Sequence, residues 1–572
     1  MKVWTVVGCF CACSLLGLAG FWFWPAPDPA PPDDPWFEDV AAACGVDFVH
    51  EAGDLGLYLT TQQNGSGVAL FDFDGDGWLD IYLLTHGGPD SQSTNRLYKN
   101  MRDGTFKNVT EQSGLGIRGF NTGVAVADIN NDGHPDVLIT QYGGVKLFLN
   151  NGNGTFKDIT AGSGIENPAW GTSASFFDYD KDGWLDLVIV NYVDYDPNKV
   201  CKGRDGLREF CGPSNFEGTA SRLFRNRTGE GKGILFKDAT LSAGLAKAPG
   251  PGLGVYCADF NGDGWPDIFI ANDQKPNHLW INQRNGTFTE EAAFYGLAVD
   301  GMGHAQAGMG VAIGDVDGDG RFDVFVSHLN IESHTLWLQQ PKRGAFRDGT
   351  AQSCLTRSDW RGTGFGTLMG DFDQDGWLDI AVANGAVARN HQLAESSQHN
   401  FHTDYGERNQ LFRNEGSGKF RDISRLNRAF CGSLNVARGL ACGDLDGDGA
   451  LDLVITTIAD RARVFRNVAK PRGNWLLVRA FNPQLKRDAY GAELVLHVGE
   501  KSMLRIVNPA HSYQSSSDPR AHFGLGMATD YDSIRVLWPD GLEEEFAGGP
   551  ANRVIQLDRA TGKRVSRVNP IP

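Results

Sequence analysis

The sequence predicts an all-β fold, a seven-bladed β-propeller followed by a small β-domain. One observation is a nine-residue acidic loop that occurs seven times in the 572 residues. Another is that each loop joins two short apolar runs, which are followed by two further runs around a glycine turn, as at 147–160. Four short strands per repeat, seven repeats and little helical periodicity are typical of a propeller.

Each acidic loop has the residue pattern of a calcium-binding loop. Residues 72–80 read Asp-Phe-Asp-Gly-Asp-Gly-Trp-Leu-Asp, with oxygen side chains at positions 1, 3 and 5, glycine at 6 and aspartate at 9. Hard oxygen ligands on alternate residues before a sharply turning glycine suit Ca²⁺. Position 7 is expected to offer its backbone carbonyl. We predict up to seven Ca²⁺ ions, held by Asp72, Asp74, Asp76, Trp78 and Asp80; Asp128, Asn130, Asp132, His134 and Asp136; Asp178, Asp180, Asp182, Trp184 and Asp186; Asp259, Asn261, Asp263, Trp265 and Asp267; Asp315, Asp317, Asp319, Arg321 and Asp323; Asp371, Asp373, Asp375, Trp377 and Asp379; and Asp444, Asp446, Asp448, Ala450 and Asp452.

The charge of the loops supports the metal interpretation. A single such loop is often only a turn, because Asp and Gly favour turns, but seven copies in one register are not explained that way. Five loops carry four Asp and two carry three, which gives 26 carboxylates. Two carboxylates about 5 Å apart repel by roughly 3 kcal/mol at an effective dielectric near 20. Without these groups the net charge of −18 would become +8, so the acidity indicates metal ligands and argues against nucleic acid as a partner.

The ends of the repeat region and its strand parity predict closure and faces. Residues 37–40 resemble a fourth strand, whereas the seventh repeat stops after a third strand at 464–467. We therefore expect the N-terminal strand to complete the last blade. The long insertions at 191–220 and 385–408 join second and third strands, which predicts that they lie on the face opposite the calcium loops, where a protein or glycan ligand would bind.

The repeats resemble the FG-GAP/VCBS repeats of integrin α-subunit heads and of many secreted bacterial proteins. A second resemblance covers 490–541, where Tyr-Gly-Ala-Glu-Leu, Asp-Pro-Arg-Ala-His-Phe-Gly-Leu-Gly and Trp-Pro-Asp-Gly are similar to the ASPIC/UnbV module. The combination is similar to the cartilage-acidic-protein-1-like family. The resemblance implies an integrin-α-like, calcium-binding, extracytoplasmic propeller and says little about biochemical activity.

The remaining features predict the domain boundaries and the compartment. Residues 1–24 form an apolar run that is either a cleaved signal peptide or a retained signal-anchor, and 25–36 are a proline-rich linker. The propeller is assigned to 37–470 and the ASPIC/UnbV-like β-domain to 471–572. An oxidising compartment favours a disulfide between Cys201 and Cys211, and Cys431 could also pair with Cys442. The chain is expected outside the cytoplasm, secreted, periplasmic or anchored at the cell surface.

Two functions stay open. The favoured one is a non-enzymatic adhesion or recognition module at the cell surface, because we find no Gly-x-Ser-x-Gly, phosphate-loop or His-Glu-x-x-His motif. The alternative is a polysaccharide-active enzyme with a site over the propeller channel. His304, His328 and His334 are expected near that opening, although solvated loop residues explain them as well. A ligand site near Tyr513 and His522 is the second choice.

Overall fold

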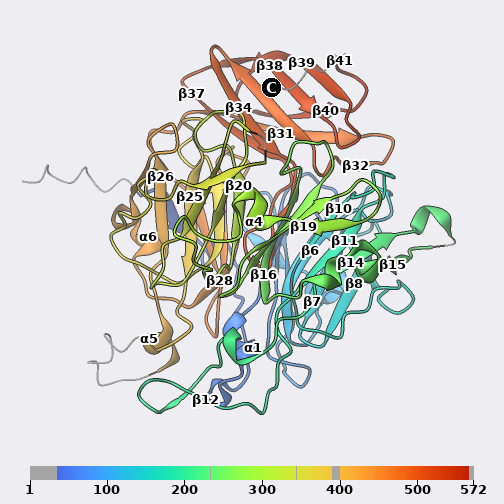
Figure 1. Ribbon diagram of the computed structural model, residues 1–572. Helices are drawn as coiled ribbons and strands as arrows, with labels where there is room; N and C mark the ends of the chain where they lie inside the picture. Colours follow the sequence, from blue (N-terminus) through green and yellow to red (C-terminus); the bar gives the residue numbers. More distant parts are fainter. Residues whose placement is uncertain (1–34, 232, 343, 390–399, 566–572) are drawn as a thin grey trace, which may run out of the picture.

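A computed structural model describes residues 35–565 except 232, 343 and 390–399, and its fold confirms the all-β prediction (Figure 1). The apolar run at 1–24 lies outside the described residues. Among those residues, no helix is long and apolar enough to cross a membrane. The repeat region forms seven sheets, one for each acidic loop, and each contains four antiparallel strands; the first sheet also takes in two short strands from the C-terminal region, and two further sheets follow toward the C-terminus.

The strands of the seven repeat sheets are short and follow the chain order, with one exception. The first four sheets are β2 (Val68–Phe71), β3 (Asp80–Leu83), β4 (Arg96–Asn100) and β5 (Phe106–Asn108); β6 (Asn121–Ala127), β7 (Asp136–Gln141), β8 (Gly144–Asn150) and β9 (Phe156–Asp158); β10 (Gly171–Phe177), β11 (Asp186–Asn191), β14 (Arg222–Asn226) and β15 (Phe236–Asp238); β16 (Gly252–Ala258), β17 (Asp267–Asn272), β18 (His278–Asn282) and β19 (Phe288–Glu290). The other three are β20 (Val311–Gly314), β21 (Asp323–Val326), β22 (Thr335–Gln339) and β23 (Phe346–Asp348); β24 (Gly364–Gly370), β25 (Asp379–Asn384), β26 (Gln410–Asn414) and β27 (Phe420–Asp422); β28 (Ala437–Gly443), β29 (Asp452–Thr457), β30 (Arg463–Asn467) and β1 (Phe37–Asp39).

The first strands of the seven sheets lie next to one another in chain order. The contacts run from β2 to β6, β10, β16, β20, β24 and β28, and β28 again contacts β2. The approach is so close that an added Cβ at Gly123 would lie 2.1 Å from the carbonyl oxygen of Thr172, and one at Gly310 would lie 2.0 Å from that of Phe365. Glycine is needed at these positions because neighbouring backbones touch there.

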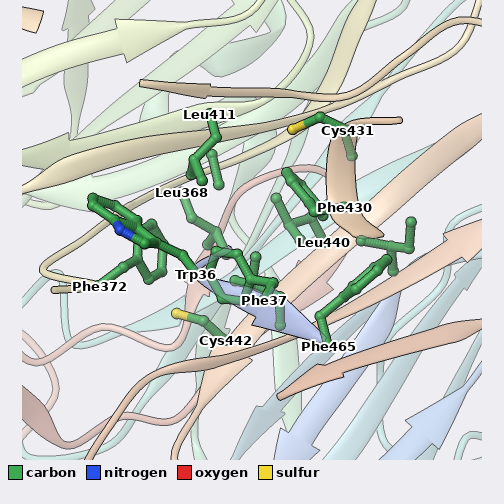
Figure 2. Close-up of a cluster of buried hydrophobic side chains, with 14 of the residues drawn as sticks. Trp36, Phe37, Leu368, Phe372, Leu411, Phe430, Cys431, Leu440, Cys442 and Phe465 are labelled. Atoms are coloured by element: carbon green, nitrogen blue, oxygen red, sulfur yellow. The ribbon is translucent and has the colours of Figure 1, made fainter. Parts of the chain in front are cut away.

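The exception in chain order is β1, which comes from the start of the chain and pairs with β30. Phe37 lies opposite Asn467, and Asp39 lies opposite Phe465, in an antiparallel ladder. Phe37 is buried and contacts Phe372 and Phe430 at ring-centroid distances of 5.5 and 5.9 Å (Figure 2). The two ends of the repeat region therefore share one sheet and one apolar cluster.

The C-terminal sheets lie across the end of the repeat sheets that carries the acidic loops (Figure 1). They contain β31 (Asn474–Asn482), β32 (Arg487–Asp488), β37 (Ala521–Gly526) and β40 (Arg553–Asp558) in one sheet, and β33 (Glu493–Val498), β34 (Lys501–Ile506), β38 (Asp530–Leu537), β39 (Glu543–Pro550) and β41 (Lys563–Arg564) in the other. Their apolar core is their own, with Trp538 and Phe523 fully buried.

One segment of this region, residues 507–518, enters the ring of first strands, and we call it the plug. Its strands β35 (Ala510–His511) and β36 (Ser515–Ser516) join the first repeat sheet, where Ser516 pairs in parallel with Ala69. Ser512 exchanges backbone hydrogen bonds with Val311 at 2.7 and 3.0 Å. Tyr513 is fully buried. The plug ties the small β-domain that is predicted from residue 471 onward into the centre of the repeats.

The opposite end of the ring is covered by three segments that we call the cap, namely residues 51–64, 191–220 and the described parts of 385–408. The cap includes α1 (Thr60–Asn64), the hairpin β12 (Cys201–Lys202) and β13 (Arg208–Glu209), and α5 (Phe401–Tyr405). The ring of Phe210 lies 5.2 Å from that of Tyr58 and 5.4 Å from that of Tyr405, so one aromatic cluster joins all three segments. Figure 1 shows β12 and α5 at the end of the molecule remote from the C-terminal sheets.

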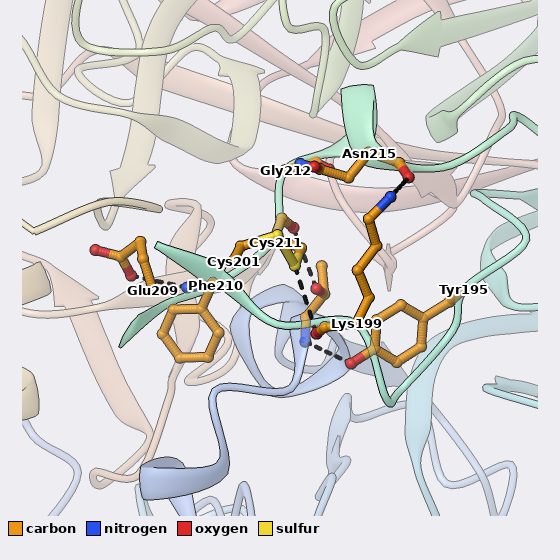
Figure 3. The surroundings of a disulfide bond; sticks show 9 residues. Tyr195, Lys199, Cys201, Glu209, Phe210, Cys211, Gly212 and Asn215 are labelled. Carbon is orange, nitrogen blue, oxygen red and sulfur yellow. Dashed lines mark hydrogen bonds between the residues drawn. A yellow bond between two sulfur atoms is a disulfide. The ribbon is translucent and has the colours of Figure 1, made fainter. Parts of the chain in front are cut away.

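A disulfide joins Cys201 and Cys211 within the cap (Figure 3), as the sequence predicts. The hydroxyl of Thr60 donates to the Cys211 carbonyl oxygen at 3.1 Å, which ties the bridged loop to α1. The other proposed pairing is wrong, because Cys431 and Cys442 are both free and buried. They lie in the apolar cluster that contains Phe37 (Figure 2), where a thiol packs as a small apolar group.

The other helical turns are short and join consecutive sheets or shape loops. They are α2 (Thr110–Ser113), α3 (Thr240–Ala243), α4 (Ala292–Tyr295) and α6 (Arg428–Cys431), with 3-10 turns at Leu55–Leu57, Pro213–Asn215, Thr228–Glu230, Leu245–Lys247 and Ser424–Leu426.

Candidate metal centres

The acidic loops bring carboxylates together as the sequence predicts. In five loops, carboxylate oxygens from positions 1, 3 and 9 all lie within 4.8 Å of one another; these groups are Asp72, Asp74 and Asp80; Asp178, Asp180 and Asp186; Asp315, Asp317 and Asp323; Asp371, Asp373 and Asp379; and Asp444, Asp446 and Asp452. The loops that begin at Asp128 and Asp259 have Asn130 and Asn261 at position 3 and offer an amide oxygen there. Three oxygen donors at this separation match the ligand preference of Ca²⁺.

The same backbone hydrogen bonds shape all seven loops. The position 1 carboxylate accepts from the glycine N–H at position 6 at 2.7–3.0 Å. The position 5 carboxylate accepts from the N–H at position 7 at 2.9–3.1 Å. The position 9 carboxylate accepts from the N–H at position 2 at 2.9–3.1 Å. These bonds hold the side chains at positions 1, 5 and 9 in place, and the metal contacts of all five predicted positions stay predictions.

Several carboxylate oxygens in these loops are buried without a hydrogen-bond partner. They are the Oδ1 atoms of Asp74, Asp180, Asp371 and Asp373. A buried carboxylate oxygen without a donor is costly, because it has lost its water and gained nothing in return. A cation between positions 1, 3 and 9 would supply the missing partner. The residues present therefore fit Ca²⁺.

The electrostatics of the loops agree with this fit. Burial, and then the negative charges of Asp74 and Asp72, raise the pKa of the Asp80 carboxyl to about 8, against backbone hydrogen bonds that lower it. Burial also raises the pKa of Asp371 to about 7. Burial and the neighbouring carboxylates raise the pKa of Asp452 well above the usual range. Protons and cations thus compete for the same oxygens.

Basic side chains on the third strand contact some of the loops from outside. Lys99 pairs with Asp74 and Asp76, Arg225 pairs with Asp180 and Asp182, and Arg413 pairs with Asp373 and Asp375. At position 3, each basic side chain contacts the Oδ2 atom of the aspartate, which leaves the Oδ1 atom of that residue for a metal ion. The basic residues thus lower the net charge of the site while one oxygen at position 3 stays available.

An amide residue at the end of each third strand links neighbouring loops, and sequence reasoning missed it. The residues are Asn100, Asn150, Asn226, Asn282, Gln339, Asn414 and Asn467. The backbone N–H of each donates to the position 9 carboxylate of its own loop at 2.7–2.9 Å. The side-chain amide donates to the position 2 carbonyl of the preceding loop at 2.8–2.9 Å. The recurrence of this amide at one register of the repeat was the available signal.

The C-terminal sheets contact the acidic loops directly. The N–H of Gly524 donates to Asp371 Oδ2 at 3.0 Å, and the N–H of Gly526 donates to the carbonyl of Gln374 at 2.9 Å. The Lys501 ammonium lies 4.2 Å from the ring centroid of Trp377. A metal ion in the loop at 371–379 would therefore stabilise a segment that also positions the C-terminal sheets.

The other residues singled out in the sequence have structural surroundings. Trp78 and Trp377 pack against Gly447 and Gly318 of the preceding loops, as expected for rings between neighbouring sheets. His328 is buried, His334 is half-buried and His304 is exposed. Tyr513 and His522 are also buried, in the ring and against the loop at 444–452, and a ligand site near them stays a prediction.

A family model described as FG-GAP-like repeat matches residues 72–139, 128–189, 259–326 and 397–455, and one described as ASPIC and UnbV matches residues 482–564. The chain carries FG-GAP-like repeats and an ASPIC and UnbV domain. The resemblance seen in the sequence is thereby confirmed.

The curated relatives are cartilage acidic proteins. The chain is 32% identical to cartilage acidic protein 1 of Homo sapiens over 341 residues, 57% of this chain and 47% of that protein. It is 31% identical to the Xenopus tropicalis protein over 350 residues, 59% of this chain and 49% of that one. The matched region spans about half the length of these relatives.

The solved structures that resemble the chain do so only weakly. An Agrocybe aegerita lectin that recognises non-reducing terminal N-acetylglucosamine has a TM-score of 0.39 and 16% identity, and covers 71% of this chain and 94% of that one. A rhamnogalacturonan lyase has a TM-score of 0.31 and 12% identity, and covers 83% and 93%. Scores this low do not bear on the activity of the chain.

Proposed function

We propose that this protein is an extracellular, calcium-stabilised recognition or adhesion module without enzymatic activity. Its seven sheets would be the blades of a propeller that β1 closes, and its loops would bind up to seven Ca²⁺ ions. The observation that carries the proposal is the set of buried, unpartnered carboxylate oxygens at the centre of the loops. The disulfide of the cap is typical of an oxidising compartment.

The bound Ca²⁺ would act on stability. An ion held by positions 1, 3 and 9 would neutralise buried carboxylates and fix each loop between the first two strands of its sheet. With free Ca²⁺ at 100 times the dissociation constant, each site that exists only in the folded state adds about 2.7 kcal/mol. A rigid, calcium-loaded scaffold then presents its cap in one conformation, which lowers the entropy lost on binding a ligand.

The cap is the surface that we assign to recognition of a protein or glycan ligand. Val200 and Leu207 are each 59% exposed, and Leu57 is 45% exposed, although all three are apolar. Exposed apolar side chains on a disulfide-bridged, rigid loop favour a binding surface. An active site over the channel, the alternative hypothesis, would need open space at this end of the ring. Side chains are packed there instead, because Tyr192 and Phe210 are buried and the hydroxyl of Tyr513 donates to the carbonyl of Asn64 at 3.2 Å.

The metal part of the proposal is tested by equilibrium dialysis and thermal melting. The dialysed chain should bind several Ca²⁺ ions, and EGTA should lower its melting midpoint. Asp323→Ala, which removes one closing carboxylate, should lower the calcium-loaded midpoint by less than EGTA does. An identical midpoint with Ca²⁺ and with EGTA would contradict the proposal.

The recognition part is tested on protein and glycan arrays with the calcium-loaded chain. Any ligand found there should lose affinity at least about tenfold for the double variant Val200→Asp, Leu207→Asp. Leu241→Asp is the matched control, because Leu241 is 84% exposed and lies outside the cap. If the cap variant and the control bind equally well, the ligand site lies elsewhere.

A further inference from the structure

The amide residues at the ends of the third strands connect each acidic loop to the loop before it. Asn226 shows the pattern: its backbone N–H donates to Asp186 Oδ1, at position 9 of its own loop, at 2.7 Å, and its side-chain amide donates to the carbonyl of Ile129, at position 2 of the preceding loop, at 2.9 Å. The N–H of Ile129 donates in turn to Asp136 Oδ2, at position 9 of that preceding loop, at 3.1 Å. One residue thus holds the position 9 carboxylates of two neighbouring loops.

The same connection occurs at all seven loops, including the pair that joins the two ends of the repeat region. Asn100 follows the first loop, and its side-chain amide donates to the carbonyl of Leu445 in the last loop at 2.8 Å. In every loop, Oδ1 of the position 9 aspartate accepts from the backbone of the amide residue, and Oδ2 accepts from the N–H of position 2. Each loop is therefore linked to a neighbour on both sides.

The linking amides are buried, and almost all of their hydrogen-bonding capacity is used. Each of the seven residues is at most 6% exposed. In six of them the amide also donates to the position 8 carbonyl of its own loop at 3.0–3.2 Å. Gln339 is the exception, because among the described residues its amide donates only to the carbonyl of Phe260. Since a buried amide that loses its acceptor is costly, a loop that moves also disturbs its neighbour.

The loops have a reason to move when no metal is bound. A metal-free loop keeps buried carboxylate oxygens without partners, as at Asp180 and Asp371, and this favours its opening. Opening displaces positions 2 and 9, which carry the links to both neighbours. A loop kept closed by Ca²⁺ therefore lowers the cost of ordering the loops beside it. Such coupling is reciprocal, because each of two linked sites must change the affinity of the other by the same factor.

We propose that the seven amide residues are positioning residues that make Ca²⁺ binding cooperative between neighbouring loops. The inference rests on the calcium binding proposed above and adds that the sites are not independent. Closure of one loop raises the Ca²⁺ affinity of each adjacent loop about fivefold or more. The coupling passes through the side-chain amide, so it is lost when the amide is removed.

The test uses the two links of one loop as controls for each other. Asn226 links the loop at 178–186 to the loop at 128–136, and Asn282 links it to the loop at 259–267. Hydrogen exchange of the full chain, measured by mass spectrometry at a series of free Ca²⁺ concentrations, gives a midpoint of protection for each loop.

Asp186→Ala removes the position 9 carboxylate that both links hold. It should raise the Ca²⁺ midpoint of each adjacent loop at least about fivefold and leave the remote loop at 444–452 nearly unchanged. In the Asn226→Ala background, Asp186→Ala should no longer shift the loop that Asn226 reaches, but should still shift the loop linked through Asn282. A through-space effect of the missing charge would persist in that background, so selective loss of the shift identifies the amide.

A second link keeps the test decisive if Asn226→Ala does not fold. Gln339 links the loop at 315–323 to the loop at 259–267, and Gln339→Ala removes one side-chain hydrogen bond, against three for Asn226→Ala. Asp323→Ala should shift the Ca²⁺ midpoint of the loop at 259–267 in the unmodified chain and not in the Gln339→Ala background.

Asn277→Ala is the matched control for the loss of a buried amide. Asn277 directly precedes β18, whereas the linking residue Asn282 is at the other end of that strand, and its amide donates to the carbonyl of Leu297 at 3.1 Å. In the Asn277→Ala background, Asp186→Ala should shift both adjacent loops as it does in the unmodified chain.

Two results would overturn the proposal. One is a shift of the loop at 128–136 by Asp186→Ala that is equal with and without the amide of Asn226. The other is no shift of either adjacent loop, because the sites then bind independently. Both results leave the calcium function standing, since the loops still gain protection with Ca²⁺. If no loop gains protection and dialysis finds no bound Ca²⁺, the calcium function fails and this inference fails with it.

Discussion

Phe37→Ala tests whether the strand at the start of the chain closes the ring of repeat sheets. Phe37 is 1% exposed and contacts Phe372 and Phe430, and its strand supplies the fourth place in the last sheet. Removal of a buried phenylalanine ring costs about 3–5 kcal/mol. Glu38→Ala is the matched control, because Glu38 lies on the same strand with 58% of its side chain exposed. Loss of its ion pair with Arg466 should cost at most about 1 kcal/mol.

The expected shift in melting midpoint follows from the size of the cooperative unit. If the roughly 430 residues between β1 and β30 unfold together, the entropy of unfolding is about 0.9 kcal/mol per degree. Phe37→Ala should then lower the midpoint by about 3–6 °C and Glu38→Ala by about 1 °C or less. The assay is differential scanning calorimetry with saturating Ca²⁺. Equal midpoints for the two variants would refute closure by β1.

Three further predictions concern the loops and the cap. Burial and neighbouring carboxylates raise the pKa of Asp80 to about 8 in the folded chain, whereas an unfolded Asp titrates near 4. Between these pH values the metal-free folded state binds more protons than the unfolded state, so it loses stability as pH rises. The rise in melting midpoint on adding Ca²⁺ should therefore be larger at pH 8 than at pH 5.5, and equal rises at the two pH values would contradict this prediction. Asn226→Ala removes buried amide hydrogen bonds to the carbonyls of Ile129 and Leu185 and should destabilise the chain by about 2–4 kcal/mol in urea unfolding. An unchanged urea midpoint would show that the link between neighbouring loops is dispensable. The double substitution Cys201→Ser, Cys211→Ser should make residues 191–220 more sensitive to limited proteolysis, while the calcium-dependent melting midpoint changes little. Unchanged cleavage would show that packing alone holds the cap.

The acidic loop could be recognised in the sequence because the residues that define it lie close together in the chain. Oxygen side chains at positions 1, 3, 5 and 9 and the glycine at position 6 recur within nine residues, and loop geometry depends mainly on such short-range choices. The missing fourth strand after residue 467 likewise pointed to residues 37–40, and the structure pairs Phe37 with Asn467.

Whether two cysteines are bonded depends on their tertiary surroundings. Cys201 and Cys211 sit in one short insertion and are bonded. Cys431 and Cys442 have a similar separation in the sequence, yet both are free and buried against apolar neighbours. Separation along the chain does not determine whether two Cβ atoms face each other; only the packing of α6 and β28 does.

By itself, the sequence determined the strand content, the seven acidic loops and the bridged pair Cys201 and Cys211, since each depends on residue type and short spacing. Tertiary structure alone decided that Tyr513 fills the ring, that Phe210 joins three distant segments into the cap, and that residues 554–556 of β40 line a cleft beside the loops. Those arrangements rest on contacts between residues hundreds of positions apart, and such contacts leave no periodic pattern in the chain. The energy that selects them comes from burial and backbone pairing, which exist only once the segments have met.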